Sequence, residues 1–552
     1  MIQLIADHII TPLGAGTEHN LEAVLRGESR LCLHSDVHGT PIPEPFMGSL
    51  LDTLPEREGF TPFEALCIEV AEPAIRRSGL DVTGPDTVFI LSTTKGNIWS
   101  SPADSARKVA TFFGNRTAPI VVSTACTSGI AAQLTAFRLL STGTYKNAVL
   151  IGCDIQTLFV VSGFQSFKAL SPEPCRPFDA ARQGLNAGEA AACMILQNVS
   201  PQGEVAQRDG EVWSLLGGSI HNDANHISGP SRTAEGSLRC LQDCLATLSE
   251  RPLDKLRTVD NLACLSVHGT GTSYNDEMEA LAIHRAGLDN TPVSALKGFY
   301  GHCMGAAGLL ETILTIHALD RGLILPVRGF ATQGTTCAVN VSPDARTTDK
   351  HTFIKLLSGF GGVNAAVAWS RGLTDPISKA GEVPQSVSIS LDSSVDLVAE
   401  YRSLHVNYPK FFKMDTLSRL GFVAVEQLLS AHPSLREALD PEHTALILAN
   451  RSASIANDRD YQATISDPAN YFPSPALFVY TLPNIVTGEL AIRHGLFGET
   501  AFFILEKETD LQPIIDATFR TSDISSAIVG WLECSDKTRY EAHLTFVKRQ
   551  DL

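Results

Sequence analysis

The sequence predicts a layered α/β protein made of three globular units, and three observations support this. Between residues 85 and 153, short apolar stretches alternate with helical ones in the order typical of βαβ units. The same order returns after residue 212, so a second α/β half follows the first. A chain of 552 residues also exceeds the size at which a single hydrophobic core keeps growing.

The elements of the two halves follow from these apolar stretches. In the first half we expect strands at residues 87–93, 118–122 and 147–154, with a helix over residues 127–143. In the second half, residues 262–267 form a strand that enters a Gly/Thr turn, and residues 306–322 form a helix. We place the first half at residues 1–205 and the second at residues 206–373.

The chain changes character near residue 374. Residues 374–384 are polar and include Pro376, Gly381 and Pro384, which predicts a linker. Residues 385–552 then form a third unit, with a helix at 416–429 and strands at 444–450 and 526–532. Its order is similar to that of the first unit, which indicates duplication of a half-domain.

A half-domain that stands alone would expose one apolar face of its sheet. We therefore expect the third unit to pack against another half. The candidates are the other units of this chain, the same unit of a second chain, or a separate subunit.

Composition and charge exclude several classes of protein. Hydrophobic residues make up 44% of the chain and charged residues 19%, as in folded globular proteins. The net charge of −17 argues against binding to nucleic acid or to an anionic membrane. No apolar run is long enough to span a membrane and no secretion signal is present, so we expect a cytoplasmic protein. The 12 cysteines lack the spacings of zinc sites, so we expect reduced thiols and no metal.

Cys126 is a candidate nucleophile. It lies where the apolar stretch APIVV passes through the small residues STA into a helix that begins near Thr127. A thiol there faces the helix N-terminus, whose partial positive charge favours the reactive thiolate and predicts a lowered pKa. The alternative is that Cys126 is one more buried, apolar cysteine.

Two histidines favour the catalytic interpretation of Cys126. His268 lies in VHGTGTSYND and His302 in YGHCMGAAG, each at the end of a strand and followed by small residues. Small neighbours leave an imidazole open to a pocket. A single histidine beside glycine is commonly a turn residue, but two of them downstream of Cys126 indicate a shared site.

Four motifs together identify a family. The segments STACTSG, HGTGT, KxxxGH followed by GAAG, and GFGGVN occur in that order and resemble the β-ketoacyl synthase family of the thiolase fold. The resemblance covers residues 1 to about 373. It implies a layered αβαβα fold built from two duplicated halves, with the third unit as an additional C-terminal thiolase-like half-domain.

The resemblance also implies a reaction and residue roles. The reaction is the decarboxylative Claisen condensation of an acyl thioester with malonyl-acyl carrier protein, as in fatty acid, polyketide or aryl polyene biosynthesis. Cys126 would carry the acyl group, and His268 and His302 would meet the enolate oxygen left by decarboxylation. The backbone N–H groups of Cys126 and Phe360 would form an oxyanion hole. The remaining roles fall to a charged pair that orients the histidines, a gating aromatic and two threonines for the phosphopantetheine arm: Lys297, Glu311, Phe360, Thr270 and Thr272.

Other members of the fold are less consistent with the motifs. A thiolase would need a second catalytic cysteine where this chain has GFGGVN, and an initiating synthase would carry asparagine in place of His302. The alternative from another class is a non-catalytic partner subunit, similar to a chain-length factor. This interpretation suits the third unit better, because Glu506 or Lys507 stands about where a nucleophile would be. A separate activity of that unit would have to use Glu506 or His494.

The resemblance implies no dissociable cofactor, because both substrates are carried on the phosphopantetheine arm of an acyl carrier protein. That carrier is the expected partner. We also expect a homodimer, or a heterodimer with a ketosynthase-like subunit.

Overall fold

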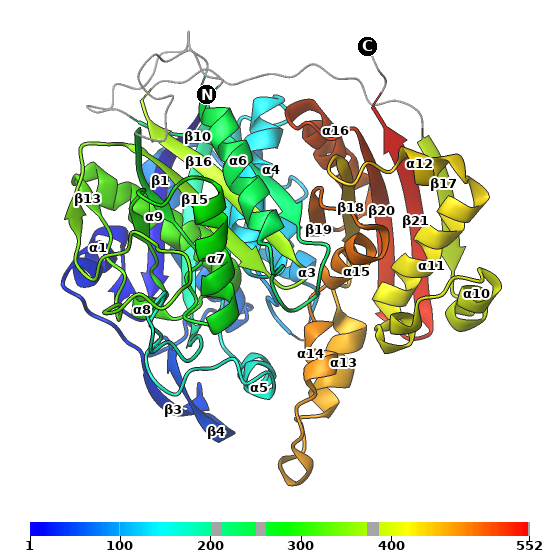
Figure 1. The fold of residues 1–552 in the computed structure, drawn as a ribbon, viewed down its shortest axis with the longest axis horizontal. Coiled ribbons are helices and arrows are strands. Elements are labelled where there is room, and N and C mark those ends of the chain that lie inside the picture. Colours follow the sequence, from blue (N-terminus) through cyan, green and yellow to red (C-terminus); the bar gives the residue numbers. More distant parts are fainter. Residues whose placement is uncertain (99, 200–211, 250–260, 373–385, 550–552) are drawn as a thin grey trace.

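The computed structural model describes residues 1–98, 100–199, 212–249, 261–372 and 386–549 (Figure 1). The predicted linker at residues 374–384 and the predicted boundary between residues 205 and 206 lie outside these ranges. Helices and strands form alternating layers, as the sequence predicted. No helix among the described residues is long and apolar enough to cross a membrane.

The first half is a five-stranded sheet with helices on both faces. Its strands run in the order β1-β9-β7-β5-β6, and β3, β4 and β8 form a separate small sheet. The strands are β1 (Ile2–Thr11), β2 (Gly14–Ala15), β3 (Cys32–Val37), β4 (Thr40–Ser49), β5 (Thr87–Ser92), β6 (Ile120–Val122), β7 (Asn147–Asp154), β8 (Ala187–Gly188) and β9 (Ala190–Asn198). The helices are α1 (Thr17–Leu25), α2 (Pro62–Ser78), α3 (Pro102–Phe112), α4 (Ser128–Ser141) and α5 (Leu158–Ser166).

The second half continues the sheet from β1 in the order β10-β16-β15-β11-β12. Its strands are β10 (Trp213–Asn222), β11 (Leu262–Ser266), β12 (Val293–Ser294), β13 (Leu323–Ile324), β14 (Arg346–Thr347), β15 (Thr352–Gly359) and β16 (Val363–Arg371). Its helices are α6 (Glu235–Ser249), α7 (Ser273–Arg285), α8 (Lys297–Tyr300) and α9 (Ala307–Asp320).

Helices α4 and α9 form the buried middle layer. Nearly every side chain of both helices is buried, which explains why their sequences are apolar all round rather than striped. The two helices approach very closely at Gly129 and Gly308. A Cβ added at Gly129 would lie 2.9 Å from the Cα of Gly308, so only glycine allows this contact. The close approach brings the N-terminal ends of α4 and α9 together.

The C-terminal half repeats the strand order of the first half. Its order β17-β21-β20-β18-β19 matches β1-β9-β7-β5-β6 element for element. Its strands are β17 (Ser386–Asp392), β18 (Thr444–Asn450), β19 (Thr500–Ile504), β20 (Ser526–Asp536) and β21 (Arg539–Lys548). Its helices are α10 (Leu397–Ser403), α11 (Thr416–Ala431), α12 (Ser434–Ala438), α13 (Ile455–Ala463), α14 (Pro475–Val479), α15 (Ile485–His494) and α16 (Gln512–Thr521).

The C-terminal half packs against the first half of the same chain. Strand β19 pairs antiparallel with β6, with Phe503 opposite Val122 and Ile504 opposite Val121, so one sheet runs through both halves (Figure 1). Helix α16 packs against α4. A buried ion pair joins α4 to the residue before β19, because the two terminal guanidinium nitrogens of Arg138 each lie 2.6 Å from a carboxylate oxygen of Glu499.

The C-terminal half exposes little apolar surface on the side of β17 and β21 that faces away from α11. On β17 and β21 the side chains that face away from α11 are polar except for the buried Val547, and Ser388 and Thr545 are hydrogen-bonded to each other at 2.9 Å. Helix α16 and the first half cover the inner side of the other strands. Of the partners considered for this half, the structure shows the first half of the same chain, and mostly polar residues occupy the uncovered face of β17 and β21.

Candidate active site

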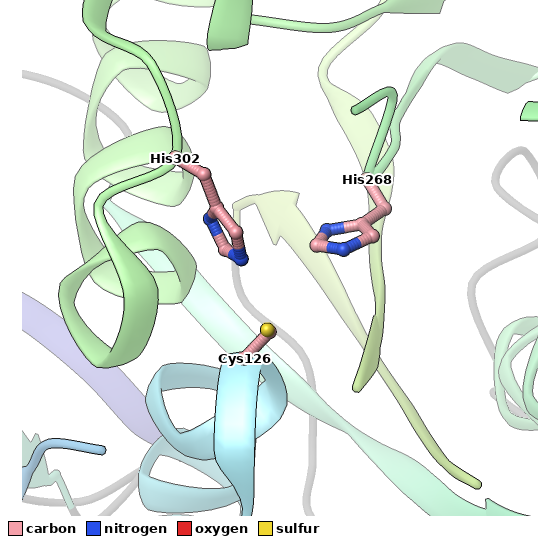
Figure 2. Close-up of side chains that lie close together, drawn as sticks. All are labelled: Cys126, His268 and His302. Atoms are coloured by element: carbon pink, nitrogen blue, oxygen red, sulfur yellow. The ribbon is translucent and has the colours of Figure 1, made fainter. Parts of the chain in front are cut away.

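Cys126, His268 and His302 meet at one point, although they come from three separate segments. The Cys126 sulfur and the nearest ring nitrogens of the two histidines all lie within 4.8 Å of one another. Figure 2 shows both imidazoles pointing toward the sulfur, one from the end of β11 and one from the turn before α9. The ring centroids of the two histidines are 5.1 Å apart. The motifs placed these three residues together correctly in space.

The backbone at the ends of α4 and α9 explains this convergence. A short 3-10 turn, Ala125–Thr127, precedes α4, and a second one, Met304–Ala306, precedes α9. Ala125 has φ of 52° and Met304 has φ of 48°, a strained left-handed conformation for residues with a side chain. The first turn directs Cys126 toward the space that His302 enters from the segment before the second turn.

The two imidazoles are neutral and poorly satisfied. Burial, followed by the charge of Lys297, holds the pKa of both His268 and His302 well below the ordinary value. Nδ1 of His268 and both ring nitrogens of His302 are buried without a hydrogen-bond partner. Unsatisfied buried nitrogens carry a free-energy cost, so they indicate groups that a ligand would satisfy.

The thiol of Cys126 does not have the lowered pKa that its place near a helix N-terminus predicted. Burial raises its pKa to about 12, against the opposing effects of Lys297 and of the backbone N–H groups of Cys126 and Phe360. Desolvation of the thiolate therefore outweighs the helix end. With a pKa of about 12, the sulfur is a protonated thiol at neutral pH.

A buried charge network lies behind His268. Lys297 Nζ donates to the backbone carbonyl of His268 at 2.7 Å and to Glu311 Oε1 at 2.9 Å. Lys355 Nζ lies 2.5 Å from the other oxygen of Glu311 and 3.1 Å from the carbonyl of Val267. Although burial opposes it, the two lysines hold the pKa of Glu311 below its ordinary value. One carboxylate between two lysines leaves excess positive charge next to the histidines.

Lys355, Glu279 and Asp276 were missed by the sequence analysis. Glu279 accepts the backbone N–H of His268 at 2.6 Å and of Gly269 at 2.8 Å. Asp276 accepts the N–H of Thr270 at 3.0 Å. The signals were present in the sequence: Lys355 is a lone charge in an apolar strand, and the two acids follow directly on the HGTGT segment.

A cavity of about 720 Å³ opens over these residues. Thr270, Thr272 and Phe360 line it together with Cys126 and both histidines. The hydroxyl groups of Thr270 and Thr272 lie 2.9 Å apart. Apolar side chains line another part of the cavity: Val160, Phe164, Phe167, Leu185 and Met304. The cavity therefore combines a polar segment with an apolar one, as a site for a thioester with a hydrocarbon chain requires.

The C-terminal half contributes to this cavity but has no comparable site of its own among the described residues. Phe478, Thr481 and Leu482 line the cavity. Glu506, which stands near the place of a nucleophile, forms an ion pair with Arg107 at 2.5 Å. His494 is buried beside Glu426, and burial lowers its pKa to about 4. Neither residue faces the cavity.

Cys126, His268 and His302 are also the one group of described residues whose donor atoms are close enough to share a metal ion. A thiol with a raised pKa and two imidazoles embedded in excess positive charge oppose a cation at this point. The geometry suits a nucleophile and two hydrogen-bond donors better.

Comparisons with known proteins identify the same family. A model of the beta-ketoacyl synthase N-terminal domain matches residues 51–202, and a model of the C-terminal domain matches residues 214–331. Nodulation protein E of Rhizobium leguminosarum bv. trifolii is 29% identical over 292 residues, which are 51% of this chain and 70% of that protein. The 3-oxoacyl-(acyl-carrier-protein) synthase 2 of Coxiella burnetii is 28% identical over 264 residues, 46% of this chain and 61% of that protein.

A solved structure shares the fold over nearly the whole chain. The PfaC keto synthase-chain length factor structure covers 99% of this chain and 78% of its own, with a TM-score of 0.79 at 14% identity. This likeness includes the C-terminal half and confirms the predicted thiolase-like fold class. Residues 51–202 and 214–331 thus match the two domains of the beta-ketoacyl synthase family, and the relatives that match about half of this chain include a 3-oxoacyl-(acyl-carrier-protein) synthase.

Proposed function

We propose that this chain joins an acyl group to a malonyl-derived unit through a thioester on Cys126. The observation that carries the proposal is the convergence of one thiol and two neutral imidazoles, all within 4.8 Å, in a cavity with an apolar segment. The thiol and both imidazoles also argue against a non-catalytic partner subunit as the role of residues 1–373.

The first step loads the acyl group. The Cys126 sulfur forms a bond to the acyl carbonyl carbon, the bond from that carbon to the carrier sulfur breaks, and the thiol proton ends on the departing carrier thiol. The raised pKa of Cys126 requires that the proton leave as the sulfur attacks and pass to the departing carrier thiol. The backbone N–H groups of Cys126 and Phe360 would receive the negative carbonyl oxygen.

The second step forms the new carbon–carbon bond. The malonyl group loses carbon dioxide, and N–H groups of His268 and His302 meet the enolate oxygen. The enolate carbon then attacks the acyl carbonyl on Cys126, and the sulfur leaves and recovers a proton. Burial and the charges of Lys297 and Lys355 keep the imidazoles neutral, while Glu311 holds both lysines and Lys297 fixes the backbone carbonyl of His268.

The substrates would arrive on an acyl carrier protein. Thr270 and Thr272 place two hydroxyl groups on the cavity wall, where they would bond the amides of a phosphopantetheine arm. We propose no separate cofactor, because the arm delivers both reacting groups. Since β19 already occupies the edge of β6, a second ketosynthase chain in the expected dimer would have to bind elsewhere.

Acylation of Cys126 and decarboxylation of the malonyl group can be measured separately. His268→Ala and His302→Ala should each lower malonyl decarboxylation about 10²- to 10³-fold, because a donor to the enolate oxygen is lost. Acylation of Cys126, followed by intact mass after incubation with a panel of acyl carrier protein thioesters, should persist. His543→Ala, a half-exposed histidine of β21, is the control. Wild-type decarboxylation in either variant would contradict its assigned role.

A further inference from the structure

The C-terminal half makes a direct contact with the loop that holds Phe360. Asn484 Nδ2 donates to the backbone carbonyl of Phe360 at 2.8 Å, and the Asn484 side chain is buried. Asn484 belongs to the C-terminal half and stands at the start of α15. A residue about 120 positions away in the chain therefore holds the GFGG loop of the catalytic unit.

Asn484 has the position of a helix cap without the function of one. Asparagine is preferred at the N-cap because its side-chain oxygen accepts a backbone N–H of the first turn. In α15 no such side-chain bond forms, and Oδ1 of Asn484 is buried without a partner. The Asn484 side chain therefore bonds the carbonyl of Phe360 and does not cap α15.

The rest of the loop is held from both sides. Asn222 Nδ2 of the catalytic unit donates to the carbonyl of Gly361 at 2.8 Å, and the Gly361 N–H donates to the carbonyl of Ile227 at 2.7 Å. From the C-terminal half, α15 approaches so closely that a Cβ added at Gly488 would lie 2.5 Å from the Gly361 oxygen. The GFGG loop therefore lies between the second half and the C-terminal half of the chain and contacts both.

The GFGG loop reaches the nucleophile. The backbone N–H of Phe360 acts to lower the pKa of the Cys126 thiol, against the larger opposing effect of burial. A Cβ added at Gly359 would lie 3.2 Å from the Cys126 nitrogen, so the loop and the nucleophile are in close contact. A shift of Phe360 would move this N–H away from the acyl carbonyl.

We propose that Asn484 is a positioning residue through which the C-terminal half holds the Phe360 N–H in place for acyl transfer, within one chain. The inference rests on the proposed function of Cys126. It predicts slower attack on the acyl carbonyl but unchanged malonyl decarboxylation, because decarboxylation uses His268 and His302, which Asn484 does not contact.

The test uses the full chain with Asn484→Ala and with Asn484→Asp, which keeps the shape but replaces the donor with an oxygen. Both should slow acylation of Cys126 by about 10- to 100-fold, approaching the loss seen when an oxyanion donor is removed. Malonyl decarboxylation should stay within about twofold of wild type. Arg451→Ala is the control, because it breaks a contact of the C-terminal half with Asp104 of the first half without touching the loop.

The outcomes separate this inference from the function on which it rests. Unchanged acylation in both Asn484 variants overturns the positioning role. An equal loss of both steps, with a lowered melting temperature, also overturns it, because that result indicates a purely structural contact. A wild-type chain that is never acylated at Cys126 overturns the proposed function itself.

Discussion

The first half and the C-terminal half of this chain have the same strand order, but two pairs of corresponding strands differ in the polarity of their faces. On β1 and β9 both faces are apolar and buried, with Ile2 and Met194 turned toward the middle layer and Ala6 and Cys193 toward the outer helices. On β17 only the face toward α11 is apolar, and on β21 the opposite face is polar except for Val547.

The difference follows from what packs against the inner face of each half. The first half packs against the second half of the catalytic unit, so its inner face must be apolar across all strands. The described C-terminal half has no such neighbour over β17 and β21, and hydroxyl and charged groups there face water. The segments that follow β6 and β19 also differ. The segment after β6 contains Cys126, and the segment after β19 contains Glu506, which is paired with Arg107.

The largest effect is expected in the segment after β6. Cys126→Ala should lower condensation by more than about 10³-fold, because the thioester route is lost. Glu506→Gln in the corresponding segment after β19 should leave condensation within about twofold, since Glu506 lies outside the cavity. Condensation of acyl carrier protein substrates, followed by mass spectrometry of the product, checks both. Elongation by Cys126→Ala at the wild-type rate would contradict the assignment.

The second effect is on the junction between the halves. Arg138→Met leaves Glu499 as a buried charge without its partner and should lower the free energy of unfolding by about 3–5 kcal/mol. The double variant Arg138→Met/Glu499→Leu should recover most of that loss, because no unpaired charge remains. Chemical denaturation measures both. A loss of less than about 1 kcal/mol in the single variant would show that the pair is solvated.

The sequence predicted the elements well and their assembly only in part. The strand expected at residues 444–450 coincides with β18, and the helix expected at residues 127–143 contains α4. That Cys126, His268 and His302 would meet could be expected from their motifs, and the structure brings the three side chains together; their catalytic roles stay a prediction. Lys355 and Asn484 were missed because a single residue carries no pattern, and its role depends on a segment far away in the chain.

The third effect concerns the length of the acyl group. Phe478 of α14 lines the cavity and lies 5.5 Å, between ring centroids, from Phe164. Phe478→Ala should enlarge the apolar segment and shift acyl preference toward longer chains by about tenfold, since a methylene in such a pocket is worth about 1–3 kcal/mol. The ratio of acyl groups retained on Cys126 measures this. Phe472→Ala is the control because its ring is 78% exposed. An unchanged ratio would show that the chain extends elsewhere.

The smallest effect is expected on the polar face of the C-terminal half. Ser388→Val with Thr545→Val would make that face apolar, as on β9 of the first half. Because these side chains lie at the surface, the free energy of unfolding should change by less than about 0.5 kcal/mol and condensation should be unaltered. Met194→Ser on β9 is the matched change in the first half and should destabilise the fold by several kcal/mol, since it buries a hydroxyl group without a partner. A large loss in the Ser388→Val/Thr545→Val variant would show that another subunit covers β17 and β21 in solution through these hydroxyl groups.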